Sequence, residues 1–240
     1  SLVPSATNPA PLCGVLIDVG GPIYDDDNFF RAAATAIQQM LTERGEAVPT
    51  EQAMRSAYDF ARNTEGVSIR KHFAEEFLQG PDDLETFSSA TRRYWLHSPE
   101  SLYQDAYDFL HAVHPFVRIA VVANQESATR EALIRDGLGE VIDAWGISAD
   151  IGVEKPSPEF FHWALEAIGC RPDETMHIGN RYDNDVRPAK ALGLRTAWLL
   201  RGEAPDSPPA EQLEEADWVI ESLKGLDQTV RSIAPAEPFR

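Results

Sequence analysis

Residues 12–22 read LCGVLIDVGGP and carry the first signal of the fold. The apolar run at 15–17 ends in an acid, Asp18, and a Gly-Gly-Pro turn follows. Such a run predicts a short buried strand and the loop that leaves it. Apolar runs of the same kind return after a long gap and predict further strands at 118–123, 144–148, 176–179, 196–200 and 218–220.

Helical patterns accompany these later strands, at 100–114, 127–136, 158–168 and 185–192. Strands that are apolar throughout, rather than at every second position, are typically buried on both faces. Their alternation with helices indicates a parallel sheet covered by helices on both sides. The sequence therefore predicts an α/β fold, in which the Pro-rich stretch 201–210 is a surface connection before the last strand.

Between the first two predicted strands the pattern is helical. Apolar residues recur at helical spacing from 29 to 41 and in three later segments that end near residue 97. The residues that carry this pattern are Phe29, Ala33, Ala36, Ile37, Met40, Leu41, Tyr58, Phe73, Phe77, Phe87 and Trp95. The stretch predicts a helical insertion in the α/β fold.

The strongest deviation in composition is the charge. The chain has 240 residues, of which 43% are hydrophobic and 25% charged, so it can bury a core of ordinary size. Its 39 acids and 21 bases give a formal net charge of −18. Such a charge repels phosphate backbones and anionic headgroups, so we expect neither nucleic acid nor a membrane as a partner. We expect a monomer or a homodimer.

The two cysteines, Cys13 and Cys170, are too few for a disulfide framework and too far apart in sequence for a metal knuckle. We expect both to pack as small apolar groups. Residues 1–11 lack the basic start and the apolar run of a signal peptide, and the sequence contains no apolar run of about 18 residues. These features predict a cytoplasmic protein with a loose N-terminal arm at 1–11.

Polar side chains follow several of the predicted strands, where an open parallel sheet binds its ligands. They are Asp18, Asn124, Lys155, Asn180, Asp183 and Asp185. Carboxylates and a lysine gathered from separate strand ends can hold a hard cation beside an anionic group. The sequence therefore predicts a site for a small anionic molecule at this edge of the sheet.

Four motifs stand in order along the chain: LIDVGG at 16–21, VVANQ at 121–125, GVEKPSPEFF at 152–161 and HIGNRYDNDVRPAKALG at 177–193. This order, with a helical insertion between the first two motifs, resembles the haloacid dehalogenase superfamily. The resemblance extends over residues 12–223. It implies a Rossmann-like core at 12–24 and 98–240 and a mobile helical cap at 25–97.

The resemblance also implies a hydrolase whose first-motif acid, here Asp18, attacks the substrate and forms a covalent aspartyl intermediate. Lys155 matches the family lysine, which with a metal ion offsets the repulsion between the carboxylate and an anionic substrate. The expected Mg²⁺ would be held by Asp18, the backbone carbonyl of Gly20, Asn180 and Asp185. The residues predicted to bind substrate are Gly21, Ala123, Asn124 and Arg181.

Four positions depart from the phosphatase pattern of this superfamily. Gly20 stands where phosphatases have a second Asp that protonates the leaving group, and such an acid typically contributes about 10²–10⁴ in rate. Pro22 replaces a Thr, and Ala123 replaces the Ser or Thr that hydrogen-bonds the phosphoryl group. Asn180 replaces an acid, so the affinity for Mg²⁺ should fall because an amide carries no charge.

These departures leave three functions open. We favour a hydrolase of a small phosphorylated or otherwise anionic metabolite whose missing acid comes from elsewhere. Asp25, Asp26 and Asp27 are candidates, although a solvated hinge more often explains such a triplet. The second function is a dehalogenase or a phosphonatase, with Lys71 as the Schiff-base lysine in the latter. The third is a degenerate site that binds a small molecule or a partner without turnover.

Specificity is expected from the predicted cap, because a cap that closes over a site supplies the contacts distant from the reacting bond. The basic residues of the cap that could reach an anion are Arg70, Lys71, His72, Arg92 and Arg93.

Overall fold

The computed structural model describes residues 9–94 and 97–240 and has a six-stranded parallel sheet at its centre. The strand order is β3-β2-β1-β4-β5-β6. The strands are β1 (Gly14–Ile17), β2 (Arg118–Ala123), β3 (Ala144–Ile147), β4 (Thr175–Gly179), β5 (Arg195–Leu199) and β6 (Trp218–Ile220). Every neighbouring pair is parallel, so the predicted α/β fold is confirmed, and each predicted strand end lies within one residue of the observed end.

Both faces of the sheet are buried, as the continuous apolar runs predict. Val15 and Ile17 of β1 pack into the larger core with the apolar residues of α5 (Gln104–Val113) and α11 (Leu226–Ile233). Leu16 points to the opposite face and packs with α8 (Pro158–Ile168) and the short α9 (Arg187–Ala191). The remaining elements of the core are η1 (Pro99–Ser101), α6 (Ala128–Arg135), α7 (Ser148–Ile151), η2 (Pro172–Glu174), the π-helical turn η3 (Tyr182–Val186) and α10 (Ala210–Glu215).

Two helix boundaries differ from the prediction. The helix expected at 100–114 is divided into η1 and α5, because Leu102 and Tyr103 are extended and Tyr103 donates its N–H to the carbonyl of Ile23 over 2.9 Å. The helix expected at 185–192 begins earlier, as the turn η3, before α9 continues it. Single π-helical turns are frequent at functional sites.

Four helices lie between β1 and β2 and form the helical unit, defined here as residues 27–94. They are α1 (Asp27–Glu43), α2 (Glu51–Arg62), α3 (Ile69–Phe77) and α4 (Pro81–Tyr94). The unit buries an apolar cluster of its own, which includes Phe30, Ile37, Phe73 and Phe87. The helical character predicted for this stretch agrees with the structure, whereas Trp95 lies outside the described residues.

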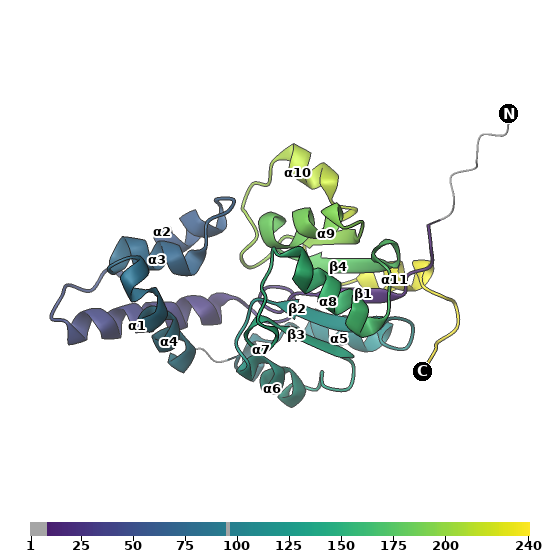
Figure 1. The fold of residues 1–240 in the computed structure, drawn as a ribbon, viewed down its shortest axis with the longest axis horizontal. Helices are drawn as coiled ribbons and strands as arrows, with labels where there is room; N and C mark the ends of the chain where they lie inside the picture. Colours follow the sequence, from purple (N-terminus) through teal and green to yellow (C-terminus); the bar gives the residue numbers. More distant parts are fainter. Residues whose placement is uncertain (1–8, 95–96) are drawn as a thin grey trace.

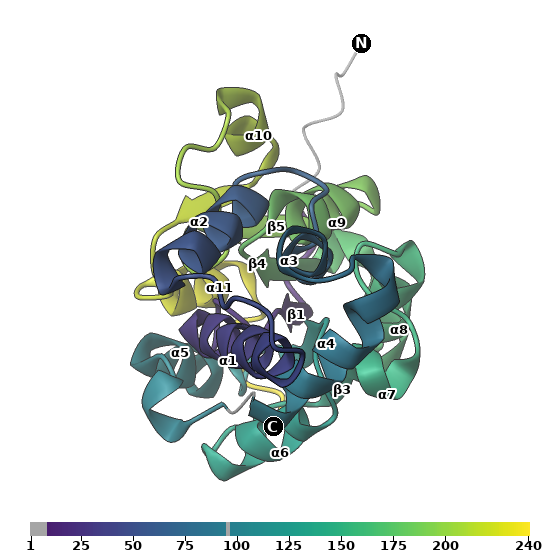
Figure 2. The ribbon, with the colours of Figure 1, turned by 90° about the vertical axis from the view of Figure 1, so that its left-hand side faces the viewer.

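The helical unit lies beyond the end of the sheet to which the β1 loop leads, at the left of Figure 1 and in front of the strands in Figure 2. Hydrogen bonds join it to the core. The N–H of Gly66 donates to Asp183 Oδ2 over 2.9 Å, and Arg62 Nη1 donates to the carbonyl of Ala204 over 2.9 Å. The carboxyl ends of the strands therefore face the helical unit.

The expectation for the cysteines was wrong, because Cys13 and Cys170 form a disulfide. Cys13 immediately precedes β1, and Cys170 follows α8, which packs against the sheet, so their Cα atoms come to 5.9 Å. A separation of 157 residues in sequence hides this proximity.

The predicted N-terminal arm at 1–11 lies mostly outside the described residues, and Leu12 is already fully buried. Within residues 9–94 and 97–240, no helix has both the length and the apolar character needed to cross a membrane.

Candidate active site

The site lies at the carboxyl end of β1, in the middle of the sheet. The chain places β2 and β3 on one side of β1 and β4 to β6 on the other, so the strand order reverses next to β1. Open α/β sheets bind ligands in the crevice at such a point. Asp18 directly follows β1, and Asn180 directly follows the neighbouring β4. A cleft of about 830 Å³, here called the main cleft, opens between these strand ends and the helical unit.

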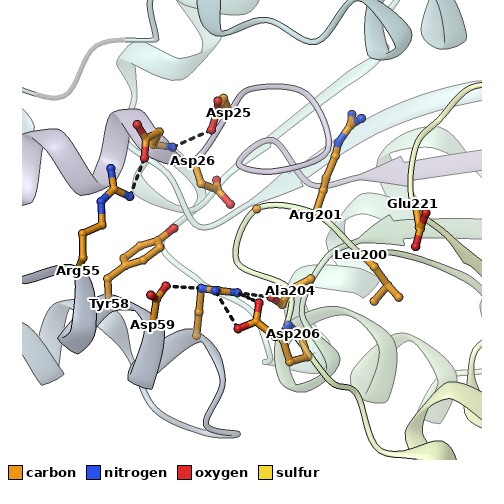
Figure 3. Close-up of a pocket in the computed structure, with 14 residues that line it drawn as sticks. Asp25, Asp26, Arg55, Tyr58, Asp59, Leu200, Arg201, Ala204, Asp206 and Glu221 are labelled. Atoms are coloured by element: carbon orange, nitrogen blue, oxygen red, sulfur yellow. Dashed lines mark hydrogen bonds and ion pairs between the residues drawn. The ribbon is translucent and has the colours of Figure 1, made fainter. Parts of the chain in front are cut away.

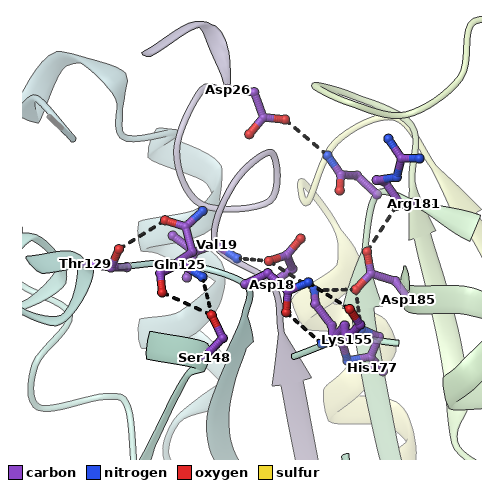
Figure 4. Close-up of polar contacts among 12 residues, drawn as sticks. Asp18, Val19, Asp26, Gln125, Thr129, Ser148, Lys155, His177, Arg181 and Asp185 are labelled. Atoms are coloured by element: carbon purple, nitrogen blue, oxygen red, sulfur yellow. Dashed lines mark hydrogen bonds and ion pairs between the residues drawn. The ribbon is translucent and has the colours of Figure 1, made fainter. Parts of the chain in front are cut away.

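Three of the predicted residues meet at the base of the main cleft (Figure 4). Lys155 Nζ lies 3.2 Å from Asp18 Oδ1 and 2.7 Å from Asp185 Oδ1. The side chains of Lys155 and Asp185 are only 2% and 1% exposed, whereas that of Asp18 is 13% exposed. Asp18 is therefore the most exposed member of this trio.

Asp185 is held from three directions. Besides Lys155, His177 Nε2 lies 2.9 Å from Asp185 Oδ1, and the N–H of Arg181 donates to Asp185 Oδ2 over 3.1 Å. Burial alone would raise the pKa of Asp185, but Lys155 and His177 hold it below its usual range. Asp185 is thus a fixed anion that anchors the lysine.

Asp18, the candidate nucleophile, has a pKa shifted in the opposite direction to that of Asp185. Burial raises the pKa of Asp18 above its usual range, Lys155 opposes this shift, and the charge of Asp185 adds to it. The N–H of Val19 donates to Asp18 Oδ1 over 2.8 Å. Since Lys155 also contacts Oδ1, Oδ2 is the carboxylate oxygen outside these two contacts.

The second motif shapes the wall of the main cleft next to β2. Ala123 is the last residue of β2 and is completely buried. Asn124 accepts from the N–H of Lys155 over 2.7 Å and donates to its carbonyl over 2.9 Å, so it holds the loop that carries the lysine. The adjacent Gln125 and Ser148 also line the cleft, and Ser148 Oγ accepts from the Gln125 N–H over 3.0 Å.

Two other predicted substrate-binding residues are engaged in structural contacts. The N–H of Gly21 donates to the carbonyl of Tyr24 over 2.7 Å. The buried guanidinium of Arg181 pairs with Asp183, with 2.8 Å between Nη2 and Oδ2, and donates to the carbonyl of Val67 over 3.4 Å. Arg181 therefore helps to join the helical unit to the core.

Asp26 stands between two cavities. It lines the main cleft and also a second cavity of about 510 Å³, which Figure 3 shows between α2 and the loop that follows β5. Burial raises the pKa of Asp26 well above its usual range, and the charges of Glu203 and Asp18 add to the shift. The Pro-rich stretch expected to be a surface connection also contributes to the two cavities, through Gly202 and Glu203.

Three of the basic residues considered in the helical unit line the main cleft: Arg70, Lys71 and Arg92. Arg70 and Arg92 share one carboxylate, with their Nη atoms 3.7 Å and 3.5 Å from Glu126 Oε1. His72 and Arg93 do not belong to the lining. The helical unit thus contributes three basic side chains to the lining of the main cleft, and Glu126 of the core lies beside two of them.

Sequence reasoning did not single out Gln125, Ser148 or Glu203. The first two directly follow the ends of strands or lie one residue further, so the rule that selected Asn124 could also have found them. Glu203 offers no such signal, because only the folding of the loop after β5 brings it to the cleft.

The side chains at the base of the cleft suit a hard cation. Asp18, Asp185 and the carbonyl of Gly20 offer only oxygen atoms, the ligands that Mg²⁺ prefers. Among the described residues, the one group of three His, Cys, Asp or Glu side chains whose ligand atoms all lie within 4.8 Å of one another is Cys13, Cys170 and Glu174, and its two sulfurs are already bonded to each other.

Comparison with known proteins gives a consistent result. Residues 14–193 match the family model described as haloacid dehalogenase-like hydrolase. The chain is 26% identical to glyceraldehyde 3-phosphate phosphatase of Methanocaldococcus jannaschii, over 92% of this chain and 97% of that protein. It is 34% identical to phosphoserine phosphatase of Thermus thermophilus, over 52% of this chain and 49% of that protein.

Solved structures share the fold. A HAD phosphatase from Thermococcus onnurineus superposes with a TM-score of 0.65 at 19% identity, over 91% of this chain and 98% of that one. The HAD-hydrolase YfnB from Bacillus subtilis, bound to magnesium, superposes with a TM-score of 0.67 at 20% identity, over 92% and 99%.

Proposed function

The chain belongs to the haloacid dehalogenase-like hydrolases, and from this membership we propose that it hydrolyses phosphate monoesters of small metabolites with Asp18 as the nucleophile. The observation that carries the proposal is the Asp18 carboxylate, partly exposed at the base of the main cleft and held by a buried lysine. The names of both curated relatives described above, each a phosphatase of a small phosphorylated compound, support this substrate class.

The arrangement of charges supports attack by a carboxylate on an anion. Lys155 Nζ contacts Asp18 Oδ1 and Asp185 holds the lysine in place, so a positive charge is fixed beside the position at which a phosphoryl group would meet Asp18. A fixed charge of this kind lowers the repulsion between nucleophile and substrate. The nucleophile and its activating cation therefore need no rearrangement before the reaction.

We propose that Mg²⁺ is held by Asp18, the carbonyl of Gly20 and Asp185. When bound, the ion neutralises negative charge on the phosphoryl oxygens. Asn180, a further expected ligand, directs its amide nitrogen to Asp26 Oδ2 and to the carbonyl of Arg201, at 3.3 Å and 3.1 Å. We therefore assign Asn180 a role in holding Asp26 rather than the metal.

We propose that the helical unit acts as a cap. Its residues Arg70 and Arg92 line the main cleft together with Asp18, and contacts from a cap select among substrates. The limits 25–97 predicted from the sequence remain our proposal for its extent.

The test is hydrolysis of a panel of phosphate monoesters with Mg²⁺ by the wild type and by Asp18→Asn. We expect release of phosphate by the wild type and a loss of several orders of magnitude in Asp18→Asn. The matched control is Asp227→Asn, which changes an acid in the first turn of α11 and should leave the rate unchanged. Equal rates in the wild type and Asp18→Asn would contradict nucleophilic attack by Asp18.

Two further outcomes would contradict the proposal and indicate a different function. Release of halide from 2-haloacids without phosphatase activity would indicate a dehalogenase. Stabilisation of the protein against heat by a metabolite that is not turned over would indicate a binding protein.

A further inference from the structure

The Asp26 carboxyl group occupies the space that a side chain at position 20 would fill. A Cβ atom built on Gly20 would lie 2.7 Å from Asp26 Oδ1, closer than real Cβ contacts allow. Gly20 is the second residue after Asp18 and lines the same cleft. The absence of a side chain at Gly20 therefore lets Asp26 approach the nucleophile's loop.

Two separate segments hold Asp26 in this place. Oδ2 accepts from the N–H of Glu203 over 2.9 Å and from Asn180 Nδ2 over 3.3 Å, and Figure 4 draws the latter bond. A Cβ on Gly202 would lie 2.3 Å from the same oxygen, so this position also requires glycine. Asp26 is 7% exposed. Since both hydrogen bonds end on Oδ2, the oxygen that faces Gly20 is Oδ1.

The structure assigns the proton transfer at the leaving group to Asp26, and this inference rests on the proposed phosphatase function. Alkoxide ions leave phosphorus slowly unless they are protonated as the bond breaks, so a hydrolase of alkyl phosphates benefits from an acid beside the cleaved bond. Asp26 is an acid in the main cleft, in contact with the loop of Asp18. Gly20 then leaves the space that the Asp26 carboxyl group occupies, and Asn180 holds that group in place.

The proton and electron balance is complete with water alone. Asp18 Oδ2 forms a bond to phosphorus, the bond between phosphorus and the ester oxygen breaks, and that oxygen takes the proton of the Asp26 carboxyl group. Water then attacks phosphorus and gives a proton to Asp26. The bond between phosphorus and Asp18 breaks, its electron pair returns to the carboxylate, and phosphate leaves with both groups restored.

The other acidic and hydroxyl side chains near the β1 loop are engaged elsewhere. Asp27 pairs with Arg55 and Arg31, with N–O distances of 2.7 Å and 2.8 Å. Asp25 is exposed and accepts from the N–H of Asp27 over 3.0 Å. The hydroxyl of Tyr24 donates to Asp136. Among these residues, Asp26 is the one whose carboxyl group fills the gap at Gly20.

The first experiment compares two leaving groups in Asp26→Asn. We expect the rate of hydrolysis of an alkyl phosphate, glycerol 3-phosphate, to fall about 10²–10⁴-fold. The rate with p-nitrophenyl phosphate should fall far less, because p-nitrophenolate leaves without a proton. The control is Asp82→Asn, which changes an exposed acid of α4 outside both cavities and should keep both rates. An alkyl phosphatase rate equal to that of the wild type, or equal losses with both substrates, would overturn the assignment.

The second experiment moves the carboxyl group. Gly20→Asp alone should lower the rate with glycerol 3-phosphate, because the new Cβ would lie 2.7 Å from Asp26 Oδ1, a collision that displaces the Asp26 carboxyl group. The double variant Gly20→Asp with Asp26→Gly removes that collision and places an acid on the vacated side. We expect it to hydrolyse glycerol 3-phosphate at least tenfold faster than Asp26→Gly alone. A double variant that folds but is no faster than Asp26→Gly would also overturn the assignment.

The same measurements separate this inference from the proposed function. If Asp18→Asn abolishes p-nitrophenyl phosphate hydrolysis and Asp26→Asn changes neither substrate's rate, only the inference about Asp26 fails. If Asp18→Asn remains active, the proposed function fails as well.

Discussion

Lys155 and Asp185 form an ion pair that is almost completely shielded from solvent, with 2.7 Å between Nζ and Oδ1. Asp185 fixes the lysine, and the lysine in turn contacts Asp18 over 3.2 Å. Burial disfavours the charged form of Lys155, but the two carboxylates raise its pKa above the usual value. Asp18 and Asp185 thus keep Lys155 positively charged at the base of the main cleft, and this charge in turn favours their ionised forms.

Lys155→Met should destabilise the protein in the absence of metal ions. The substitution leaves the buried Asp185 and the largely buried Asp18 without their cation, and breaking a buried pair in this way typically costs about 3–5 kcal/mol. The measurement is urea unfolding in EDTA. Lys190→Met is the control, because Lys190 pairs with Asp217 at the surface over 3.3 Å and its loss should change stability by about 1 kcal/mol or less. Similar effects of the two substitutions would contradict this account.

Much of the sheet and the base of the site could be predicted because parallel strands place their ends at one edge. Asp18 and Asn180 directly follow strands, and the pattern of apolar runs located those strands within one residue. Asp185 followed from the fourth motif, although the π-helical turn that presents it gives no periodic signal.

Asp26 could not be assigned from the sequence alone. Its position depends on how the loop after β1 folds back and on space left by Gly20 and Gly202, the latter nearly 180 residues away in the sequence. The disulfide was hidden for the same reason, since Cys13 and Cys170 are neighbours only after α8 has packed on the sheet. Contacts between distant segments have no periodic pattern in the chain.

Arg70→Gln should weaken the binding of substrates that carry a second negative charge. Arg70 lines the main cleft, and its Nη2 lies 3.7 Å from Glu126 Oε1, a long contact that a carboxylate of the substrate can replace. A charged hydrogen bond contributes about 1.5–3 kcal/mol, so KM for a phosphorylated carboxylic acid should rise about 10–100-fold. KM for a phosphate ester with a neutral tail should hardly change. Arg93→Gln, outside the cleft, is the control, and equal shifts of KM for both substrates would argue against this role.

Asp83→Asn should destabilise the helical unit in a manner that depends on pH. Both Nη atoms of Arg44 donate to Asp83 over 2.7 Å, and these bonds hold the pKa of Asp83 below its usual 3.8. An acid whose pKa is lowered by folding adds stability above its unfolded pKa, and this stability is lost as pH falls through the folded value. At pH 7 the variant should melt about 2–4 °C below the wild type, the shift expected for one net hydrogen bond in a chain of this size.

The melting difference between Asp83→Asn and the wild type should shrink as pH is lowered below about 3.8, where Asp83 of the wild type becomes protonated. Its exposed neighbour Asp82 provides the control variant Asp82→Asn, whose melting should follow that of the wild type at every pH. A difference for Asp83→Asn that is independent of pH would show that the charge of Asp83 is not its cause.

Reduction of the disulfide should lower stability without abolishing the active site. The bond closes a loop of 157 residues between the start of β1 and the end of α8, and removing a bond of this kind typically costs about 2–5 kcal/mol. Because the chain has two cysteines in all, the native protein should take up no alkylating reagent and the reduced, unfolded protein should take up two equivalents. The double variant Cys13→Ser with Cys170→Ser should unfold at lower urea concentration yet keep its dependence on Asp18, since both sulfurs lie at the opposite ends of the strands from that residue. Two reactive thiols in the native protein would show that the bond does not form in solution.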